Sequence, residues 1–219
     1  MQAETPKQYL RLADKTVLEH TLNTLLACER LSGVVLVLSA SDQHWPEIEG
    51  RYQGQALETV TGGAERCHSV LNGLHHLADK SDENDWVLVH DAARPCLSPG
   101  SLDRLLEQGL QSEDGAILAM PVGDTLKHAG EDQEITSTVD RSGLWAAQTP
   151  QLFHVSALSD AIDAAQRDGR ELTDEASAME LAGARPKLVM GSAANIKITH
   201  PSDLAIAEAW LNWAKPQTT

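Results

Sequence analysis

The sequence predicts an α/β fold, a mainly parallel sheet flanked by helices, because short aliphatic runs alternate along it with amphipathic segments. The aliphatic runs VVLVL (34–38), WVLV (86–89) and AILAM (116–120) contain no polar residues. Such runs are typical of strands buried on both faces of a parallel sheet, and the segments between them predict right-handed βαβ units. The 219 residues, 42% of them apolar, are consistent with a single domain over 1–219.

The predicted helices carry recognisable start signals. In TVLEHTLNTLLACER, Thr16 and Glu19 have the spacing of a capping box. ERCHSVLNGLHHLA and SPGSLDRLLEQGL each place four aliphatic residues on one face. TDEASAMELAG predicts a short helix capped by Thr173, and PSDLAIAEAWLNWA predicts a final amphipathic helix that begins at Pro201.

Residues 121–142 interrupt this alternation. The stretch PVGDTLKHAGEDQEITSTVDRS has few apolar residues and a turn-prone centre at 130–133, so we expect a polar β-hairpin. An isolated two-stranded hairpin is marginally stable in water, and we therefore expect this one to pack against a second copy of the chain. The alternative is a mobile surface loop.

Composition excludes several function classes. With 17 Lys plus Arg against 32 Asp plus Glu, the net charge of −15 argues against binding to nucleic acid or to an anionic membrane. The three cysteines are far apart without CxxC spacing, which indicates a reducing compartment rather than a disulfide or zinc framework. No apolar run approaches the roughly 20 residues of a membrane span, and MQAETPKQYL lacks a signal-peptide pattern, so a cytoplasmic protein is expected.

The stretch WVLVHDAARPCL holds the first candidate site. His90, Asp91 and Arg94 follow a predicted strand, where ligands bind in open α/β sheets. Asp91 is suited to a magnesium–nucleotide complex, and the planar guanidinium of Arg94 to a phosphate. Two alternatives stay open: Asp91 caps the next turn and pairs with Arg94, or His90 and Asp91 form the metal pair of a phosphohydrolase. The second needs further histidines, and the adjacent His75 and His76 point in different directions.

The turn TGGAERCHSV holds the second candidate site. Gly62 and Gly63 lead from a probable strand, LETV, into a helix N-terminus, where backbone amides can bind an anionic or carbonyl group. An ordinary tight turn is the simpler interpretation of the two glycines alone. Three further segments, PKQYL, VDRSGLWAAQTPQ and NIKIT, offer candidate phosphate ligands: Lys7, Arg141, Thr149 and Lys197. Taken in isolation, each of the basic residues is better explained as solvated surface.

Taken together and in order, PKQYL, GGAERCHSV, VHDAARP, VDRSGLWAAQTPQ, TDEASAME and NIKIT resemble the cytidylyltransferases of the methylerythritol phosphate pathway. The resemblance runs from Met1 to the final helix. That family condenses CTP with 2-C-methyl-D-erythritol 4-phosphate and releases pyrophosphate, in a step toward isoprenoid precursors. The resemblance implies a Rossmann-like nucleotidyltransferase fold and a homodimer clasped through the hairpin, here called the arm (121–142).

The resemblance also implies roles for individual residues. Lys7, Arg141 and Lys197 would be catalytic, Lys7 by stabilising charge on the phosphorus under attack, and Asp91 would hold Mg²⁺. Contacts to CTP would come from Lys7, Gly63, Ala64, Arg66, Ser69, Asp91 and Ala92. Contacts to the sugar phosphate would come from Arg94, Thr125, Arg141, Thr149, Thr173 and Lys197. Cys67, in the base-reading turn, is expected to be a packed side chain rather than a covalent catalyst.

Two departures from the family's pattern accompany the resemblance. Family members begin with a strand and an alanine-, glycine- and arginine-rich loop that ends in Arg-Met, whereas this sequence starts at that methionine. We expect that the natural start lies upstream; the alternative is a true truncation. Each donor of such a loop is worth about 3 kcal/mol in a preorganised site, so a chain without it is expected to lose turnover. Ala194 stands where relatives are expected to have an acidic residue, and no role is assigned to it.

The sequence is also compatible with two other functions. A ribitol 5-phosphate cytidylyltransferase would share the fold and much of the CTP site. A noncatalytic dimeric protein could instead bind a sugar phosphate through Arg141, Thr149 and Lys197 without using CTP.

Overall fold

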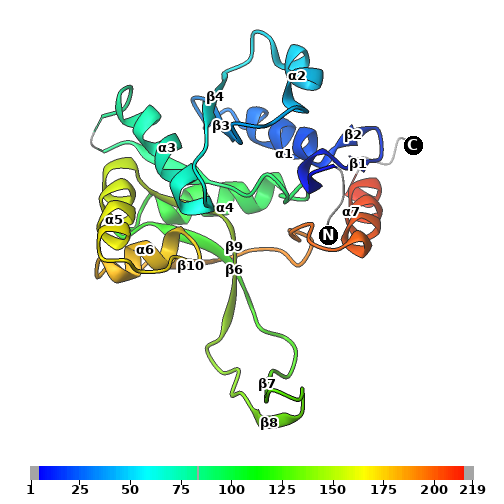
Figure 1. The fold of residues 1–219 in the computed structure, drawn as a ribbon, viewed down its shortest axis with the longest axis vertical. Helices are drawn as coiled ribbons and strands as arrows, with labels where there is room; N and C mark the ends of the chain where they lie inside the picture. Colours follow the sequence, from blue (N-terminus) through cyan, green and yellow to red (C-terminus); the bar gives the residue numbers. More distant parts are fainter. Residues whose placement is uncertain (1–4, 83, 215–219) are drawn as a thin grey trace.

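The computed structural model describes residues 5–82 and 84–214 and shows an α/β body from which the arm projects (Figure 1). The strands are β1 (Arg11–Leu12), β2 (Lys15–Thr16), β3 (Val34–Leu38), β4 (Leu57–Thr61), β5 (Trp86–Val89), β6 (Ala116–Pro121), β7 (Lys127–Ala129), β8 (Ile135–Thr138), β9 (Trp145–His154) and β10 (Lys187–Met190). The α-helices are α1 (Val17–Leu26), α2 (Trp45–Ile48), α3 (Arg66–Ala78), α4 (Pro99–Gly109), α5 (Val155–Arg167), α6 (Glu175–Leu181) and α7 (Pro201–Ala214), and Lys7–Tyr9 and Glu49–Tyr52 form 3₁₀ turns. None of these helices is long and apolar enough to cross a membrane.

The main sheet has the order β10-β6-β9-β5, and β3 pairs with β4 in a separate parallel ladder. Strand β9 runs antiparallel to both of its neighbours, so β5, β6 and β10 all point the same way. The predicted α/β class is confirmed. The sequence analysis did not identify β9, because its segment, WAAQTPQLFH, has polar residues and a proline at its centre.

Burial differs among the predicted strands. Strand β6 is buried over most of its length, as predicted. In β3 only Leu36 is buried, and β5 is half-buried throughout, so the prediction of full burial is wrong for these two strands. The reason is their position: β5 lies at the end of the main sheet, and no strand among the described residues pairs with the second edge of β3.

Two helical layers cover the main sheet. On one face, α3, α5 and α6 enclose Ile117 and Phe153 with a core that includes Leu74, Leu158 and Met179. On the other face, α4 packs Leu102, Leu105 and Leu106 against Leu118, Leu152 and Val189. Because side chains alternate between the two faces of the sheet along β6 and β9, these strands contribute residues to both cores. A third core joins α1, α2 and β3, and α7 packs on β1 and the segment 93–96.

The predicted helix starts can be compared with the observed caps. Thr16 and Glu19 form the expected capping box, and α7 begins at Pro201. The prediction that Thr173 caps α6 is wrong, because the cap is Asp174, whose carboxylate accepts a hydrogen bond of 2.9 Å from the Ser177 amide. Thr173 lies one residue earlier, and its own amide donates to the Ser177 hydroxyl.

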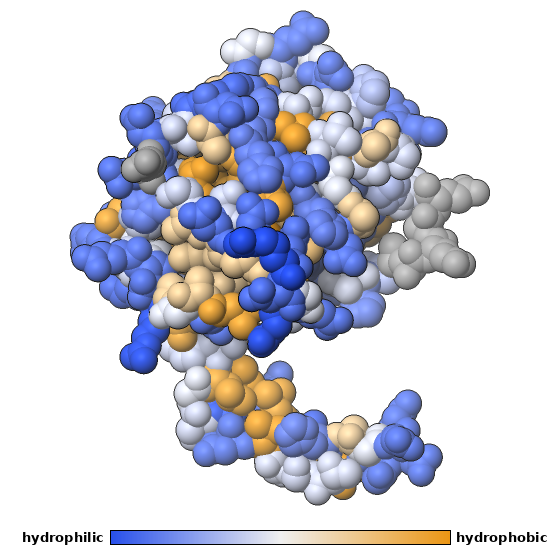
Figure 2. Space-filling view, turned by 60° about the vertical axis from the view of Figure 1, so that its left-hand side comes forward, coloured by the Kyte–Doolittle hydropathy of each residue, from blue (hydrophilic) through white to orange (hydrophobic). Residues whose placement is uncertain are grey.

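The arm is the predicted hairpin. Strands β7 and β8 pair antiparallel around a turn in which the Gly130 amide donates to the Glu134 carbonyl, at 2.9 Å. The arm extends away from the body and carries apolar side chains toward its base (Figures 1 and 2). Its exposed apolar residues are Leu126, Ile135 and, at the root, Leu144. A projecting two-stranded ribbon with so little burial is at most marginally stable on its own.

The core on the α5 side should dominate stability. Leu158→Ala removes a fully buried side chain, and we expect it to lower the free energy of unfolding by about 2–5 kcal/mol. The matched control is Leu181→Ala on α6, where the same change is made at a half-exposed position. Urea unfolding followed by circular dichroism measures both, and equal losses would contradict the assigned core.

Candidate active site

The candidate site is centred on Asp91, just after β5 ends at Val89. Its side chain is 11% exposed, and Oδ2 lies 3.0 Å from Lys197 Nζ and 3.3 Å from Arg94 Nε. Oδ1 lies 3.4 Å from Arg66 Nε. The three cations come from the start of α3, the loop after β5 and the segment before α7. The structure therefore brings together four predicted site residues at the carboxyl ends of the strands.

Lys7 is a further cation near this cluster. Burial, together with repulsion from Lys197 and Arg94, holds the pKa of Lys7 below its ordinary value, although Asp91 attracts the ammonium. Burial favours the neutral acid of Asp91, but Arg66, Lys197 and Arg94 outweigh it and keep the pKa of Asp91 below its ordinary value. Asp91 is therefore ionised at neutral pH. Several cations around one carboxylate form a surface that attracts an anionic ligand.

Glu175, which the sequence analysis missed, holds Arg66 in place. Its carboxylate is 2% exposed and accepts two hydrogen bonds from the Arg66 guanidinium, at 2.6 and 3.0 Å. Paired hydrogen bonds of this kind fix the guanidinium plane as well as its position. The pair joins the start of α3 to the start of α6. An acid in the first turn of a helix is common, so no sequence pattern marked Glu175 as buried.

The start of α6 is itself tied to the sheet by Gln151 of β9. Its side chain is buried, donates to Asp174 Oδ2 at 2.9 Å and accepts from the Ala176 amide at 2.8 Å. Glu175 therefore sits on a helix end that the main sheet positions. Thr173, the predicted sugar-phosphate residue, is exposed directly before this end.

Two buried polar residues position the loop that carries Asp91. Thr149 Oγ1 accepts a hydrogen bond of 3.0 Å from the Asp91 amide and is 2.9 Å from His90 Nδ1. Asn195 donates to the Thr149 carbonyl at 2.8 Å, and its own carbonyl accepts from Arg94 at 2.7 Å. The loop after β5, strand β9 and the segment before α7 are thus linked. Thr149 was predicted as a ligand residue, whereas Asn195 was not predicted.

The alternative of a histidine-rich metal site finds no support in this geometry. Burial lowers the pKa of His90 to about 4, and its Nδ1 is engaged by Thr149. His75 lies 3.8 Å from Asp163, and His76 lies 2.8 Å from Glu58. His75 and His76 are therefore paired elsewhere and do not gather around Asp91.

The turn 62–65 between β4 and α3 requires its glycines. The Gly62 amide donates to the Leu38 carbonyl at 2.7 Å, and the Gly63 amide donates to Ser69 Oγ at 3.1 Å. A Cβ atom on Gly63 would lie 2.3 Å from the Cβ of His68, a contact that real structures do not tolerate. The amides of both glycines are thus engaged within the protein, while the backbone of Gly63 and Ala64 stays exposed at the start of α3.

The remaining predicted residues lie on either side of the cluster. Ala92 follows Asp91, and its carbonyl accepts from Thr21 of α1 at 3.0 Å, which fixes its place. Thr125 and Arg141 are exposed at the two ends of the arm. Within residues 5–82 and 84–214, neither side chain contacts the Asp91 cluster.

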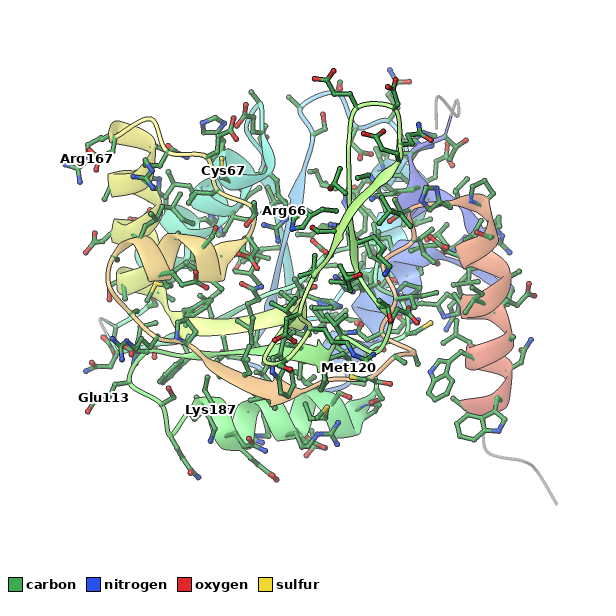
Figure 3. All side chains as sticks on the ribbon, turned by 90° about the horizontal axis from the view of Figure 1, so that it is seen from below. Arg66, Cys67, Glu113, Met120, Arg167 and Lys187 are labelled. Carbon is green, nitrogen blue, oxygen red and sulfur yellow. The ribbon has the colours of Figure 1, made fainter. Side chains whose placement is uncertain are left out.

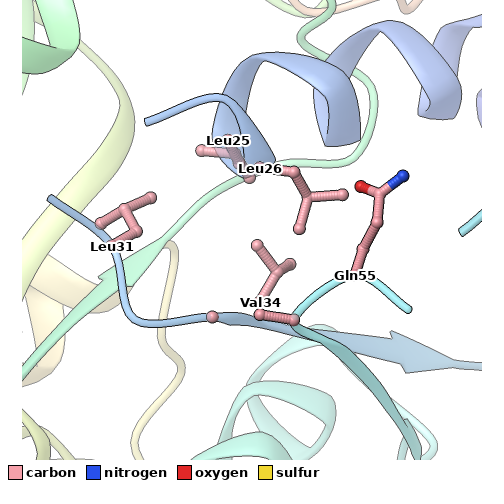
Figure 4. A pocket seen from close by; sticks show the side chains of 7 residues that line it. Leu25, Leu26, Leu31, Val34 and Gln55 are labelled. Atoms are coloured by element: carbon pink, nitrogen blue, oxygen red, sulfur yellow. The ribbon is translucent and has the colours of Figure 1, made fainter. Parts of the chain in front are cut away.

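A small pocket of about 180 Å³ lies beside the first residue of β3, Val34 (Figure 4). It is lined by Leu25, Leu26, Leu31, Gly33, Val34, Gln55 and Ala56. Its walls contain no charged group, and it lies at the amino end of the strand. Ligands of open α/β sheets bind at the carboxyl ends, so this pocket is a packing defect rather than the site.

The fold and the cluster define the class: an α/β protein with basic side chains gathered around one aspartate and a glycine turn at the carboxyl edge of its sheets. Comparisons with known proteins narrow this class. A family model for 2-C-methyl-D-erythritol 4-phosphate cytidylyltransferase matches residues 1–213. The chain belongs to this family.

Individual relatives agree with the family match. The 2-C-methyl-D-erythritol 4-phosphate cytidylyltransferase of Haemophilus influenzae is 50% identical over 211 residues, which cover 96% of this chain and 90% of the relative. That of Tolumonas auensis is 51% identical over 207 residues, covering 94% and 88%. A crystal structure of 4-diphosphocytidyl-2C-methyl-D-erythritol synthase superposes with a TM-score of 0.87 at 42% identity, covering 94% of this chain and 95% of that one.

The Arg66–Glu175 pair should stabilise the folded chain. We expect Glu175→Ala to lower the free energy of unfolding by about 1–3 kcal/mol, because it removes two charged hydrogen bonds and leaves Arg66 without its buried partner. Glu180→Ala, at an exposed position of the same helix, is the control. Urea unfolding compares the two, and an unchanged Glu175→Ala midpoint would show that the pair does not hold the two helices together.

Proposed function

We propose that this protein transfers the cytidylyl group of CTP to 2-C-methyl-D-erythritol 4-phosphate and releases pyrophosphate. The observation that carries the proposal is the cluster of Arg66, Arg94 and Lys197 around Asp91, with Lys7 nearby. The two substrates, a triphosphate and a phosphate monoester, bring four phosphate groups to this site, and the protein as a whole carries a net charge of −15. A local basic cluster is therefore needed to hold them.

In the proposed reaction, a phosphate oxygen of the sugar phosphate attacks the α-phosphorus of CTP, and the bond from that phosphorus to the bridging oxygen breaks. Pyrophosphate leaves with the bonding electron pair. The nucleophile is already ionised near neutral pH, because the second pKa of a phosphate monoester is about 6. No general base is required. The protein aligns the two substrates and places cations where negative charge accumulates.

CTP is assigned to the side of the site formed by the turn and the start of α3. In this proposal the cytosine lies against Gly63, Ala64 and Ser69, and the ribose lies against Ala92. Lys7 and Arg66 contact the phosphates. The support for this assignment is the exposed glycine turn at Gly63 and Ala64, together with the direct contact between Arg66 and Asp91.

Asp91 is the residue that would hold Mg²⁺. Its chemistry fits, since magnesium binds one or two carboxylates and completes its shell with water and substrate phosphates. Oδ2 is engaged by Lys197 at 3.0 Å and by Arg94 at 3.3 Å, whereas Oδ1 has only the long contact from Arg66 at 3.4 Å and retains capacity for another ligand. When bound, the ion neutralises charge on the triphosphate and on the departing pyrophosphate.

The sugar phosphate is assigned to the opposite side of Asp91. Arg94, Thr173 and Lys197 would contact it from the body, and Thr149 would hold the Asp91 loop in place. Thr125 and Arg141 would contribute from the arm. We propose a homodimer in which the arm packs on a second copy, because its exposed Leu126, Ile135 and Leu144 need an apolar partner. The free cysteines are consistent with a cytoplasmic enzyme.

The proposed function is tested by magnesium-dependent release of pyrophosphate from CTP with the full natural protein. We expect turnover with 2-C-methyl-D-erythritol 4-phosphate and little with ribitol 5-phosphate. The reverse preference would identify the ribitol enzyme. Calorimetry that detects sugar-phosphate binding without CTP binding would instead establish the noncatalytic alternative.

Lys197→Ala should reduce kcat/KM for the sugar phosphate by about 100-fold or more, because it removes a cation from a preorganised site. Lys187→Ala on β10 is the control, since Lys187 is exposed and outside the cluster. Steady-state kinetics with the sugar phosphate varied at saturating CTP measure the effect. Unchanged kinetics in Lys197→Ala would remove this residue from the site.

The arm should carry the dimer interface. We expect the native protein to be a dimer by light scattering at micromolar concentration. Ile135→Asp should shift it toward monomer, because a buried unpaired charge at an interface is costly. Ile206→Asp on α7 is the control, at a residue that is 57% exposed, compared with 67% for Ile135. A monomeric native protein would refute the proposed dimer.

A further inference from the structure

Three side chains at the start of α3 form a cluster that the proposed reaction does not use. Glu65, Cys67 and His68 each offer one metal-ligating atom, and these atoms all lie within 4.8 Å of one another. The Cys67 Sγ is 3.8 Å from Glu65 Oε2. We propose that this cluster binds a divalent cation that prefers thiolate ligands, such as Zn²⁺.

The donor set favours such a cation. Thiolate, imidazole and carboxylate are the three ligand types of zinc sites, at about 2.0–2.3 Å from the metal. Ligand atoms on a tetrahedral shell of that radius are roughly 3.3–3.8 Å apart. The separation of Cys67 from Glu65 already has this value. Magnesium prefers oxygen ligands, so the thiol distinguishes this cluster from the Asp91 site.

His68 supplies a second, independent observation. Its Nδ1 is buried and has no hydrogen-bond partner among the described residues. Buried polar atoms are rarely left unpaired, and an ion is one of the few explanations for such an atom. Coordination by this nitrogen would satisfy it, and the bound ion would also fix the tautomer of the ring.

The cluster is separate from the Asp91 site, although Arg66 stands between Glu65 and Cys67 in the sequence. Arg66 points toward the middle of the molecule, where it contacts Glu175 and Asp91, whereas Cys67 lies on another side of the helix start (Figure 3). Three protein ligands leave a fourth position open for water or another ligand. The thiol and the carboxylate bring two negative charges when bound, which balance those of the divalent cation.

The test is titration of the purified protein with Zn²⁺ alone, without nucleotide and with a non-chelating reductant. Isothermal calorimetry should show one ion per chain. Loss of an outer hydrogen bond to a metal ligand already costs 10- to 100-fold in affinity, so Cys67→Ser and His68→Asn should each weaken binding by at least about 10-fold. Cys28→Ser is the matched control, because Cys28 is a second, partly exposed free thiol outside the cluster.

A spectroscopic readout distinguishes ligation from a change in folding. Co²⁺ bound at the same cluster should give a thiolate-to-cobalt charge-transfer absorption that Cys28→Ser retains and Cys67→Ser loses. Circular dichroism checks that the variants are folded. Absence of stoichiometric Zn²⁺ binding to the native protein, or equal binding by Cys67→Ser, would overturn the proposal. Because no step uses CTP or a sugar phosphate, the result does not depend on the proposed function.

Discussion

The architecture of the site depends on one carboxylate. Asp91 lies where three cationic side chains from distant parts of the chain meet, with Lys7 close by. Without its negative charge, these cations would repel one another in a partly buried setting, and such repulsion is much stronger there than in water. The same arrangement leaves an excess of positive charge. The aspartate therefore holds the cluster together without neutralising its attraction for anions.

The residues that surround Asp91 show how much of the chain is used to place it. Thr149 holds the Asp91 amide, and Asn195 holds the Thr149 carbonyl and the Arg94 guanidinium. Glu175 binds Arg66, and Gln151 fixes the start of α6 that carries Glu175. Each of these four side chains is almost fully buried. Burying a polar group is costly unless it is hydrogen-bonded, so the supporting network constrains the positions of its members as an apolar core does.

Local patterns predicted those parts of the molecule that depend on neighbours in sequence. The capping box at Thr16, the start of α7 at Pro201 and the arm were all predictable. The place of Asp91 followed from a general rule about strand ends. The buried partners of Arg66 and Arg94 could not be predicted in this way, because Glu175 and Asn195 lie about a hundred residues away and are buried by tertiary packing. Strand β9 escaped detection for a related reason: its polar residues serve the network rather than solvent.

Strand β9 also carries an evolutionary consequence. It is a continuous ten-residue strand that starts at the root of the arm with Trp145, reaches Thr149 beside the Asp91 loop, and ends at His154 before α5. The segment that anchors the arm and the segment that positions the Asp91 loop thus belong to one strand, whose pairing with β6 shifts register between Ala147 and Gln151. A one-residue insertion or deletion between them would turn every later side chain of β9 to the opposite face. The arm can diverge freely only beyond its root, so its tip should vary among relatives while the length of β9 stays constant.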